Sequence, residues 1–213
     1  MKTKLLLGLA FLATLGMTSC KKDKPKEPTS VKIGNKDYAI VKIGNQTWTT
    51  ENYSGEGGIY YQENDVNKTE YGKFYTIEEA KAITPPTGWR LPTKEDFKKL
   101  FEGQGVQFGP AAEGSNRSNE VSLESLKKLM ATTGWKGDVQ GTNTSGFTGI
   151  PTGYKYGSDF VQVDESFVFW TSSSADDKPY FFAVLPEGGY YALYRPLAEY
   201  GICKFSVRFV KDN

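Results

Sequence analysis

The spacing of apolar residues changes twice along this chain, and that order constrains the fold more than any other feature. Strand-like alternation over residues 31–50 is followed by helical spacing over residues 76–132, and strand-like patterns return over residues 160–210. Strands, then helices, then strands are typical of α+β proteins. The sequence therefore predicts an α+β domain with a twisted, mainly antiparallel sheet, two to three helices and long loops.

The first strands are predicted from a short repeat. The phrase VKIGN occupies residues 31–35 and returns at residues 41–45, and each Gly-Asn pair is a turn signal between alternating residues. We expect the strands around these turns to form a small antiparallel meander. The predicted strands are 31–33, 37–43, 46–50, 160–163, 167–171, 180–185, 190–194 and 202–210. In the last one, apolar residues alternate with Ser206 and Arg208, which predicts a single buried face.

Three helices are predicted from capping signals and apolar stripes. Thr76 and Glu79 fit a capping box for a helix that ends near Ile83. Thr93 begins a second helix, which Gly103 ends, and a third covers about residues 122–132 with its leucines on one side.

The N-terminal residues resemble a bacterial export signal. Lys2 and Lys4 precede an apolar run over residues 5–15, which is shorter than the roughly 20 residues that span a bilayer. The phrase MTSC at residues 17–20 then resembles the lipobox of lipoproteins. This resemblance implies cleavage before Cys20 and acyl chains, such as palmitate, on that cysteine. An ordinary signal peptide with a chance cysteine and a core helix are the alternatives.

The chain thus divides into three predicted parts. Residues 1–19 are the lipoprotein signal peptide, residues 20–30 are the lipidated cysteine with a flexible tether, and residues 31–213 are one domain. The tether is predicted from the phrase KKDKPKEPTS, which contains no apolar residue. We expect an outer membrane lipoprotein, facing the periplasm or the cell surface, as in the Bacteroidetes.

Composition excludes several kinds of chemistry. The chain has no histidine, and with Cys20 assigned to lipid only Cys203 remains, so no internal disulfide, cysteine metal cluster or histidine triad can form. Basic and acidic residues number 26 and 25, a balance that gives no footprint for nucleic acid. We expect no metal, no cofactor and no enzymatic activity.

Six short phrases stand out along the chain. They are Lys42–Trp48 with Glu51-Asn52, Gly72–Tyr75 with Glu79-Ala80, Gly88–Thr93, Gly146-Phe147 with Gly153-Tyr154, Phe169–Ser173 and Ser206–Val210. Taken in order, they resemble one family, the Fibrobacter succinogenes major paralogous domain. The resemblance covers about residues 31–211 and implies a C-type lectin-like fold, in which two helices flank a twisted sheet and long loops carry ligand sites.

The chain departs from this family at two cysteines. Members often carry one before the Gly-Trp-Arg-Leu-Pro phrase and one in the closing strand, where this chain has Pro85 (or Thr84) and Phe209. The resemblance implies that packing replaces a disulfide there, and Cys203 is expected to be a small buried side chain. The calcium loop of lectins and the cysteines of the formylglycine-generating enzyme are both missing, so neither activity carries over.

The motif residues are expected to have structural roles. Trp89 and Trp170 are predicted to lie in the core rather than to form a ligand platform, and Trp48 is expected to be a structural residue of the first motif. Arg90 and Arg208 are predicted to pair with a buried carboxylate or with carbonyl groups.

A binding site is predicted from Tyr190, Tyr191, Tyr194 and Arg195. Alternation places Tyr190 and Tyr191 on opposite faces of a strand, so at least one should face solvent and be able to stack on a sugar or anchor a protein. The alternative is a strand with aromatic cross-strand pairs. The acidic residues of two other segments, 159–165 and 176–178, are interpreted as solvated turns rather than cation sites.

The function expected from the sequence is a membrane-anchored envelope lipoprotein with a non-catalytic module that binds a glycan or an envelope protein. The alternative is a structural or assembly component of a cell-surface, adhesin-type complex. The lectin-like resemblance favours the first function, and a large exposed apolar patch would favour the second.

Overall fold

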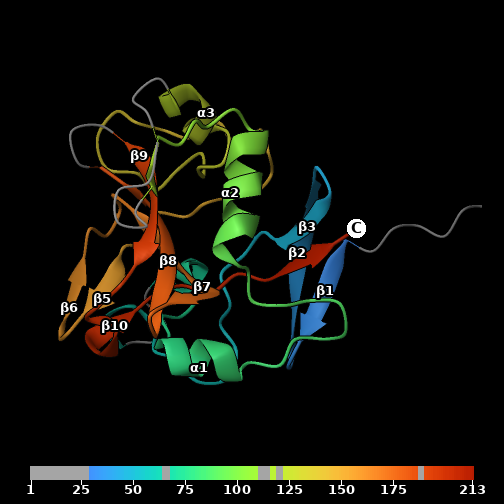
Figure 1. Ribbon diagram of the computed structural model, residues 1–213, viewed down its shortest axis with the longest axis vertical. Coiled ribbons are helices and arrows are strands. Elements are labelled where there is room, and N and C mark those ends of the chain that lie inside the picture. The colour runs from blue at the N-terminus through green and yellow to red at the C-terminus, as the bar shows by residue number, and fades with distance from the viewer. Residues whose placement is uncertain (1–28, 64–67, 110–115, 119–121, 187–189) are drawn as a thin grey trace, which may run out of the picture.

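The computed structural model describes residues 29–63, 68–109, 116–118, 122–186 and 190–213. Every ladder between named strands in these ranges is antiparallel. Figure 1 shows the strands in separate groups, with helices beside them. The α+β class with mainly antiparallel sheets is therefore confirmed.

The first sheet joins the beginning of the domain to its end. Its strand order is β1-β2-β3-β11. The two Gly-Asn turns connect its first three strands, so the predicted meander is confirmed. Its strands are β1 (Ser30–Ile33), β2 (Lys36–Ile43), β3 (Gln46–Thr49) and β11 (Val210–Asp212).

The central sheet has the order β4-β9-β8-β7, and a smaller sheet has the order β10-β5-β6. The turn between β7 and β8 has left-handed backbone at Asp176 and Asp177, as expected of a tight hairpin. The strands are β4 (Asn116–Arg117), β5 (Tyr154–Tyr156), β6 (Asp159–Val161), β7 (Phe167–Ala175), β8 (Lys178–Leu185), β9 (Tyr191–Pro196) and β10 (Cys203–Lys204).

Three α-helices lie in the described ranges: α1 (Ile77–Ala82), α2 (Lys94–Gly103) and α3 (Leu123–Lys127). Both predicted caps are confirmed, because Thr76 with Glu79 and Thr93 with Asp96 form complete capping boxes. Within these ranges, no helix is long and apolar enough to cross a membrane.

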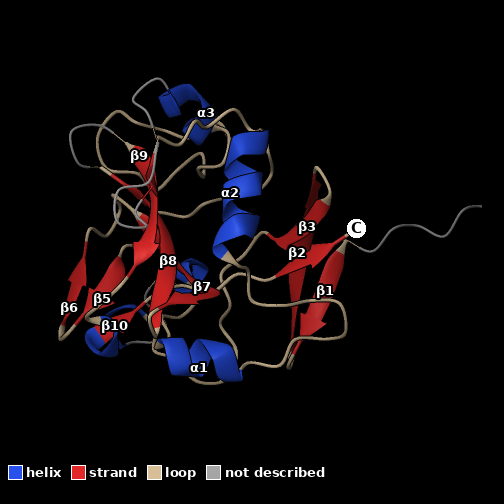
Figure 2. Cartoon of the chain, viewed as in Figure 1, coloured by secondary structure: helices blue, strands red, loops and turns tan. Residues whose placement is uncertain are grey.

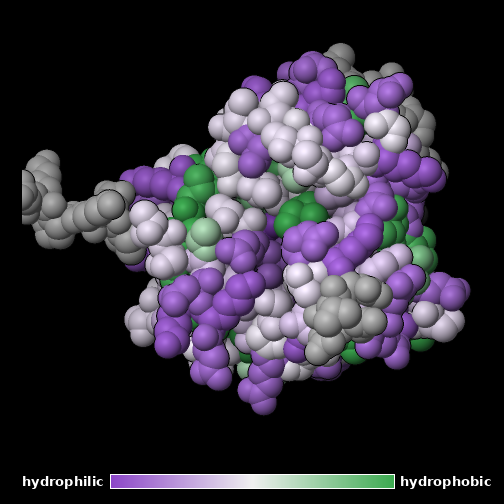
Figure 3. All heavy atoms as spheres, turned by 180° about the vertical axis from the view of Figure 1, so that it is seen from behind, coloured by the Kyte–Doolittle hydropathy of each residue, from purple (hydrophilic) through white to green (hydrophobic). Residues whose placement is uncertain are grey.

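Helix α2 packs between the first and the central sheet (Figures 1 and 2). The Phe97 ring lies 5.0 Å from the Trp48 ring on β3 and 5.0 Å from the Phe182 ring on β8. Strand β7 divides the interior in two, since Phe169 faces the α2 side and Trp170 faces the α1 side. On the outside, the face in Figure 3 shows small hydrophobic areas separated by hydrophilic residues.

The third helix is shorter than predicted. It ends at Lys127, although Leu129 and Met130 remain buried. The reason is that the backbone of the next residues pairs with Gly149 instead of continuing the helix: Gly149 N–H donates to Leu129 O and Ala131 N–H donates to Gly149 O. A side chain at Gly149 would collide with the Phe167 ring, so this close approach requires glycine.

The prediction of one strand over residues 202–210 with one buried face is wrong. Strand β10 and strand β11 are separate, and every residue from Phe205 to Val210 is buried. This segment runs through the interior, where its backbone bridges Tyr75, then Phe169, then Arg90. Period-two alternation alone cannot distinguish a half-buried strand from one that is covered on both faces. The sequence also did not predict β5.

We expect Arg208→Met to lower the free energy of unfolding by about 3–5 kcal/mol, because the carbonyl groups that Arg208 bonds would lose their donor inside the protein. Urea denaturation of the soluble form measures the change. Arg195→Met, at an exposed arginine, is the matched control and should change stability by less than about 0.5 kcal/mol. Equal effects of the two substitutions would contradict the prediction.

Candidate functional site

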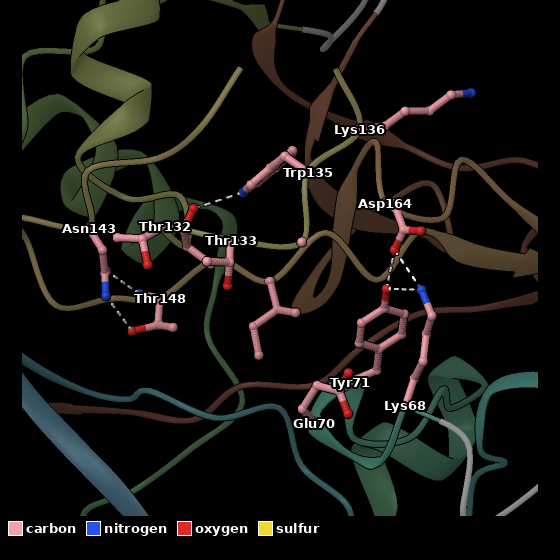
Figure 4. Close-up of a pocket in the computed structure, with 13 residues that line it drawn as sticks. Lys68, Glu70, Tyr71, Thr132, Thr133, Trp135, Lys136, Asn143, Thr148 and Asp164 are labelled. Carbon is pink, nitrogen blue, oxygen red and sulfur yellow. Dashed lines mark hydrogen bonds and ion pairs between the residues drawn. The ribbon is translucent and has the colours of Figure 1, made fainter. Parts of the chain in front are cut away.

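The candidate site is a pocket of about 620 Å³ formed by segments that are far apart in the sequence (Figure 4). One wall is the short 3-10 helix η2 (Thr69–Tyr71), and the opposite wall is the segment after α3. The lining residues are Lys68, Glu70, Tyr71, Ala131, Thr132, Thr133, Gly134, Trp135, Lys136, Asn143, Thr148, Ile150 and Asp164.

Three of these residues form a hydrogen-bonded triad. Lys68 Nζ donates to Asp164 Oδ1 over 2.7 Å and contacts Tyr71 Oη over 2.6 Å, and Tyr71 Oη donates to the same carboxylate oxygen. Burial opposes the charge on Asp164, but the bonds from Lys68 and Tyr71 outweigh it and lower the pKa of Asp164. Burial, reinforced by Asp164, raises the pKa of Tyr71 to about 12. At neutral pH the site therefore holds a Lys⁺–Asp⁻ pair and a protonated phenol.

The other polar groups divide into those already bonded and those open to a ligand. The Asn143 amide bonds Thr148 twice, through the Thr148 backbone N–H at 2.8 Å and the Thr148 hydroxyl at 2.9 Å. In contrast, the hydroxyls of Thr132 and Thr133 make no hydrogen bond to any residue in the described ranges, and Figure 4 shows them turned into the pocket. The pocket therefore offers free hydroxyl groups beside a balanced charge pair.

Backbone strain gathers around this pocket. Lys68, Asn143, Thr148 and Asp164 all have positive φ, with values of 45°, 48°, 57° and 63°. Left-handed backbone is uncommon outside glycine and is unusual for a β-branched residue such as Thr148. Such strain persists only where the surrounding structure holds it, and it clusters at functional sites. This concentration singles out the pocket from the other hollows of the surface.

The aromatic platform predicted at the ninth strand is not formed. Tyr191 and Tyr194 are only 5% and 4% exposed, because both faces of β9 are covered. The Arg117 guanidinium lies 3.5 Å from the centre of the Tyr191 ring, and Tyr194 stacks on Phe182. The alternative, aromatic packing across the sheet, accounts for Tyr194, whereas the Tyr191 ring is covered by Arg117 of β4.

The remaining two residues of that prediction lie apart. Tyr190 is half-buried against Trp135, a lining residue of the pocket, with ring centres 5.3 Å apart. Arg195 is exposed, and its guanidinium lies 5.7 Å from the Phe181 ring centre. Of the four predicted residues, only Tyr190 therefore lies next to the pocket.

Comparison with known proteins identifies the family. A model of the Fibrobacter succinogenes major domain matches residues 41–211. The chain belongs to this family. No curated protein and no solved structure matches the chain. The matched range contains the whole pocket and begins within β2, so β1 precedes it.

In this Fibrobacter succinogenes major domain, the two motif arginines have the predicted structural roles. Arg90 bonds both oxygens of Asp96, whose side chain is 5% exposed, and reaches Asp212 over 2.8 Å. Arg208 has no exposed surface and bonds the Asn52 side chain and the carbonyl groups of Thr49, Phe147 and Thr148. Burial lowers the pKa of Arg208.

The motif tryptophans differ from one another. Trp48 and Trp170 are both fully buried, so the predicted core position of Trp170 is confirmed. Trp89 is only half-buried. It packs against the core but is not enclosed by it, so it is more exposed than predicted. The loop that carries it, between α1 and α2, lies at the edge of the first sheet, where Arg90 bridges Val210.

Phe209 and Cys203 are both buried in the closing part of the chain. Phe209 is 1% exposed and packs edge-on against the Tyr53 ring, with centres 5.5 Å apart. Cys203 is 2% exposed, as predicted, and burial raises the pKa of its thiol to about 11. It is therefore a protonated, inert side chain at neutral pH.

The sequence did not predict the triad. Asp164 is expected in a solvated turn, and no role is expected for Lys68 or Tyr71. Lys68 and Tyr71 lie 96 and 93 positions away from Asp164 along the chain, so no local spacing relates them. Isolated polar residues in loops carry no signal of their eventual partners.

We expect Asp96→Asn to cost about 2–3 kcal/mol of stability at neutral pH, because the buried carboxylate accepts bonds from Arg90, Thr93 and Gln46. Burial opposes the charge on Asp96, but these bonds outweigh it and lower its folded pKa. The stabilisation is therefore present above the unfolded pKa of about 3.9 and is lost as pH falls through the folded pKa.

Urea denaturation from pH 7 downward measures this effect. The unfolding free energies of the wild type and the Asp96→Asn variant should converge in acid. Asp138→Asn, at an exposed aspartate, is the control and should match the wild type throughout. A deficit in the variant that stays constant down to the most acidic pH would contradict the assignment.

Proposed function

We propose that this protein is an outer membrane lipoprotein, anchored by lipid on Cys20, whose domain binds a glycan in the pocket around Lys68, Tyr71 and Asp164. The observation that carries the proposal is this pocket: free hydroxyls and a balanced charge pair, held on strained backbone. A C-type lectin-like topology is part of the proposal. It is supported by the pairing of β3 with the final strand and by a pocket built from long loops.

The chemistry of the lining suits a neutral sugar. Sugar hydroxyls both donate and accept hydrogen bonds, and the pocket presents an ammonium donor, a carboxylate acceptor and hydroxyls that do both. Lys68 and Asp164 neutralise each other, and the other charged lining residues, Glu70 and Lys136, have opposite signs. The lining therefore has no excess charge that would select an ion. Ile150 adds an apolar surface for ring carbons.

A non-catalytic role is the second part of the proposal. Glycoside hydrolysis needs one carboxylic acid that stays protonated near neutral pH. The described carboxyl groups with a shifted pKa are Glu79, Asp96 and Asp164, and in each the pKa is lowered. Among the described residues, no three metal-ligating side chains converge either. These features favour glycan binding without catalysis.

An assembly role in a cell-surface complex is the second candidate. Tyr156 and Ile202 are the described large hydrophobic residues that are exposed. Tyr156 ends β5 and Ile202 ends the short 3-10 helix before β10, and they are neighbours because Gly157 N–H donates to Ile202 O. They offer a contact point, but the face in Figure 3 shows no wide apolar area. Stable interfaces bury much larger surfaces, so we favour the glycan.

We expect a Lys68→Met/Asp164→Asn variant to bind its glycan at least about tenfold more weakly than the wild type, because hydrogen bonds to both charged groups are lost. A glycan array identifies the ligand, and titration calorimetry measures its affinity. The matched control is Lys36→Met/Glu51→Gln, which removes a similar surface pair, 3.0 Å apart, outside this pocket.

Equal weakening in the two variants would place binding elsewhere. Absence of any glycan ligand on the array would contradict the glycan assignment and leave a protein partner as the alternative. Circular dichroism of each variant should stay unchanged, which separates lost binding from lost folding.

We expect the wild-type chain to partition into the membrane fraction and Cys20→Ser to abolish this. Acyl chains contribute about 0.8 kcal/mol per buried CH₂, so two or three of them form a stable anchor. Mass spectrometry of the N-terminal peptide measures the acylation on Cys20. An unmodified cysteine in the wild-type chain would contradict the anchor.

A further inference from the structure

A second hollow of about 560 Å³ lies on the first sheet, where the tether joins the domain. The last tether residues, Thr29 and Ser30, line it themselves. The other lining residues are Val31, Ile40, Val41, Lys42, Thr47, Trp89, Lys211 and Asn213. This hollow, the tether groove, shares no lining residue with the proposed glycan site.

The tether groove presents two cations side by side. In the sheet register, Lys42 of β2 and Lys211 of β11 are both paired with Thr47 of β3, so the three lie in one row on one face. Neither lysine side chain forms an ion pair or hydrogen bond with a residue in the described ranges. No aspartate or glutamate lines the groove. These ammonium groups are therefore free to bind an anion.

Beside the lysines lies an amphipathic tryptophan. Trp89 is half-buried at the groove. The Lys211 side chain lies beside the neighbouring Gly88: a Cβ atom placed on this glycine would be 3.8 Å from Lys211 Cδ. Tryptophan rings and lysines with apolar stems favour the boundary between lipid headgroups and acyl chains. The groove thus combines positive charge with an aromatic ring in the way a membrane surface requires.

The length of the tether keeps the groove near the bilayer. Residues 20–29 reach at most about 35 Å when fully extended. Because the tether enters the domain at the groove, this face is the part of the domain held closest to the membrane. The tether also carries Lys21, Lys22, Lys24 and Lys26, which would add to attraction by anionic lipid.

We infer that the tether groove docks on the anionic phospholipid headgroups of the bilayer that holds the Cys20 lipid, with Lys42 and Lys211 binding phosphate groups. The docking role rests on the proposed lipidation, which supplies the proximity, but not on the glycan ligand. It would fix the orientation of the domain on the membrane instead of leaving it free on its tether.

The test uses residues 20–213 with Cys20→Ser, which keeps every described strand and helix but carries no lipid. Its partition is measured by sedimentation with phosphatidylcholine vesicles and with vesicles containing an equal part of phosphatidylglycerol. We expect binding only to the anionic vesicles, and at least about a tenfold loss in Lys42→Glu/Lys211→Glu. The control, Lys178→Glu/Arg195→Glu, reverses two exposed charges of the central sheet and should bind as the parent does.

Trp89 supplies an independent readout. Trp48 and Trp170 are fully buried and Trp135 is 5% exposed, so quenching by brominated phosphatidylcholine, included in the anionic vesicles, reports mainly on Trp89. Trp89→Phe should remove most of this quenching. Circular dichroism checks the folding of every variant.

Three outcomes would overturn the inference: no binding to anionic vesicles, equal losses in the groove and control variants, or full binding in the groove variant, which would assign it to the tether alone. Because the tested chain carries no lipid and no glycan, none of these outcomes depends on the acylation of Cys20 or on the sugar ligand. Failure of the docking role is thus distinguishable from failure of the proposed function.

Discussion

The buried guanidinium of Arg208 is the constraint on which the rest of the structure depends. It has no exposed surface, and its N–H groups bond Thr49 O, Asn52 Oδ1, Phe147 O and Thr148 O. An unsolvated charge is costly unless its donors are satisfied, so these partners must assemble together. They join the end of β3, the final segment of the chain and the loop that forms one wall of the pocket around Lys68, Tyr71 and Asp164. The strained Thr148 is thereby held by the same group that locks the two ends of the domain together.

Aromatic packing around β7 completes this frame. Phe97 on α2 contacts rings from both neighbouring sheets, and Trp170 on the other side of β7 donates its indole N–H to Tyr75 O over 2.7 Å. Phe209 of the closing segment is 1% exposed, and its ring packs edge-on against the Tyr53 ring. This contact stabilises the fold by burying apolar surface. The rigid interior leaves the long loops free to carry the pocket.

The two hollows divide the surface by chemistry. The pocket of Lys68, Tyr71 and Asp164 has paired charges and free hydroxyls, as a neutral polar ligand requires. The tether groove has unpaired lysines and a half-buried tryptophan, as an anionic lipid surface requires. The pocket concentrates four non-glycine residues with left-handed backbone, whereas the tether groove is lined mainly by strands of the first sheet. The domain thus combines a strained binding loop region with a regular sheet face.

The sequence by itself determined the features that depend on near neighbours. The capping boxes at Thr76 and Thr93, the Gly-Asn turns, the α+β class and the family all follow from residues a few positions apart. Tertiary structure alone decided that Tyr191 and Tyr194 are covered and that the closing segment is buried on both faces. It also brought Asp164 to Lys68 and Tyr71. The reason is physical: a cap or a turn is a local hydrogen bond, whereas burial and distant pairing depend on how all the layers pack together.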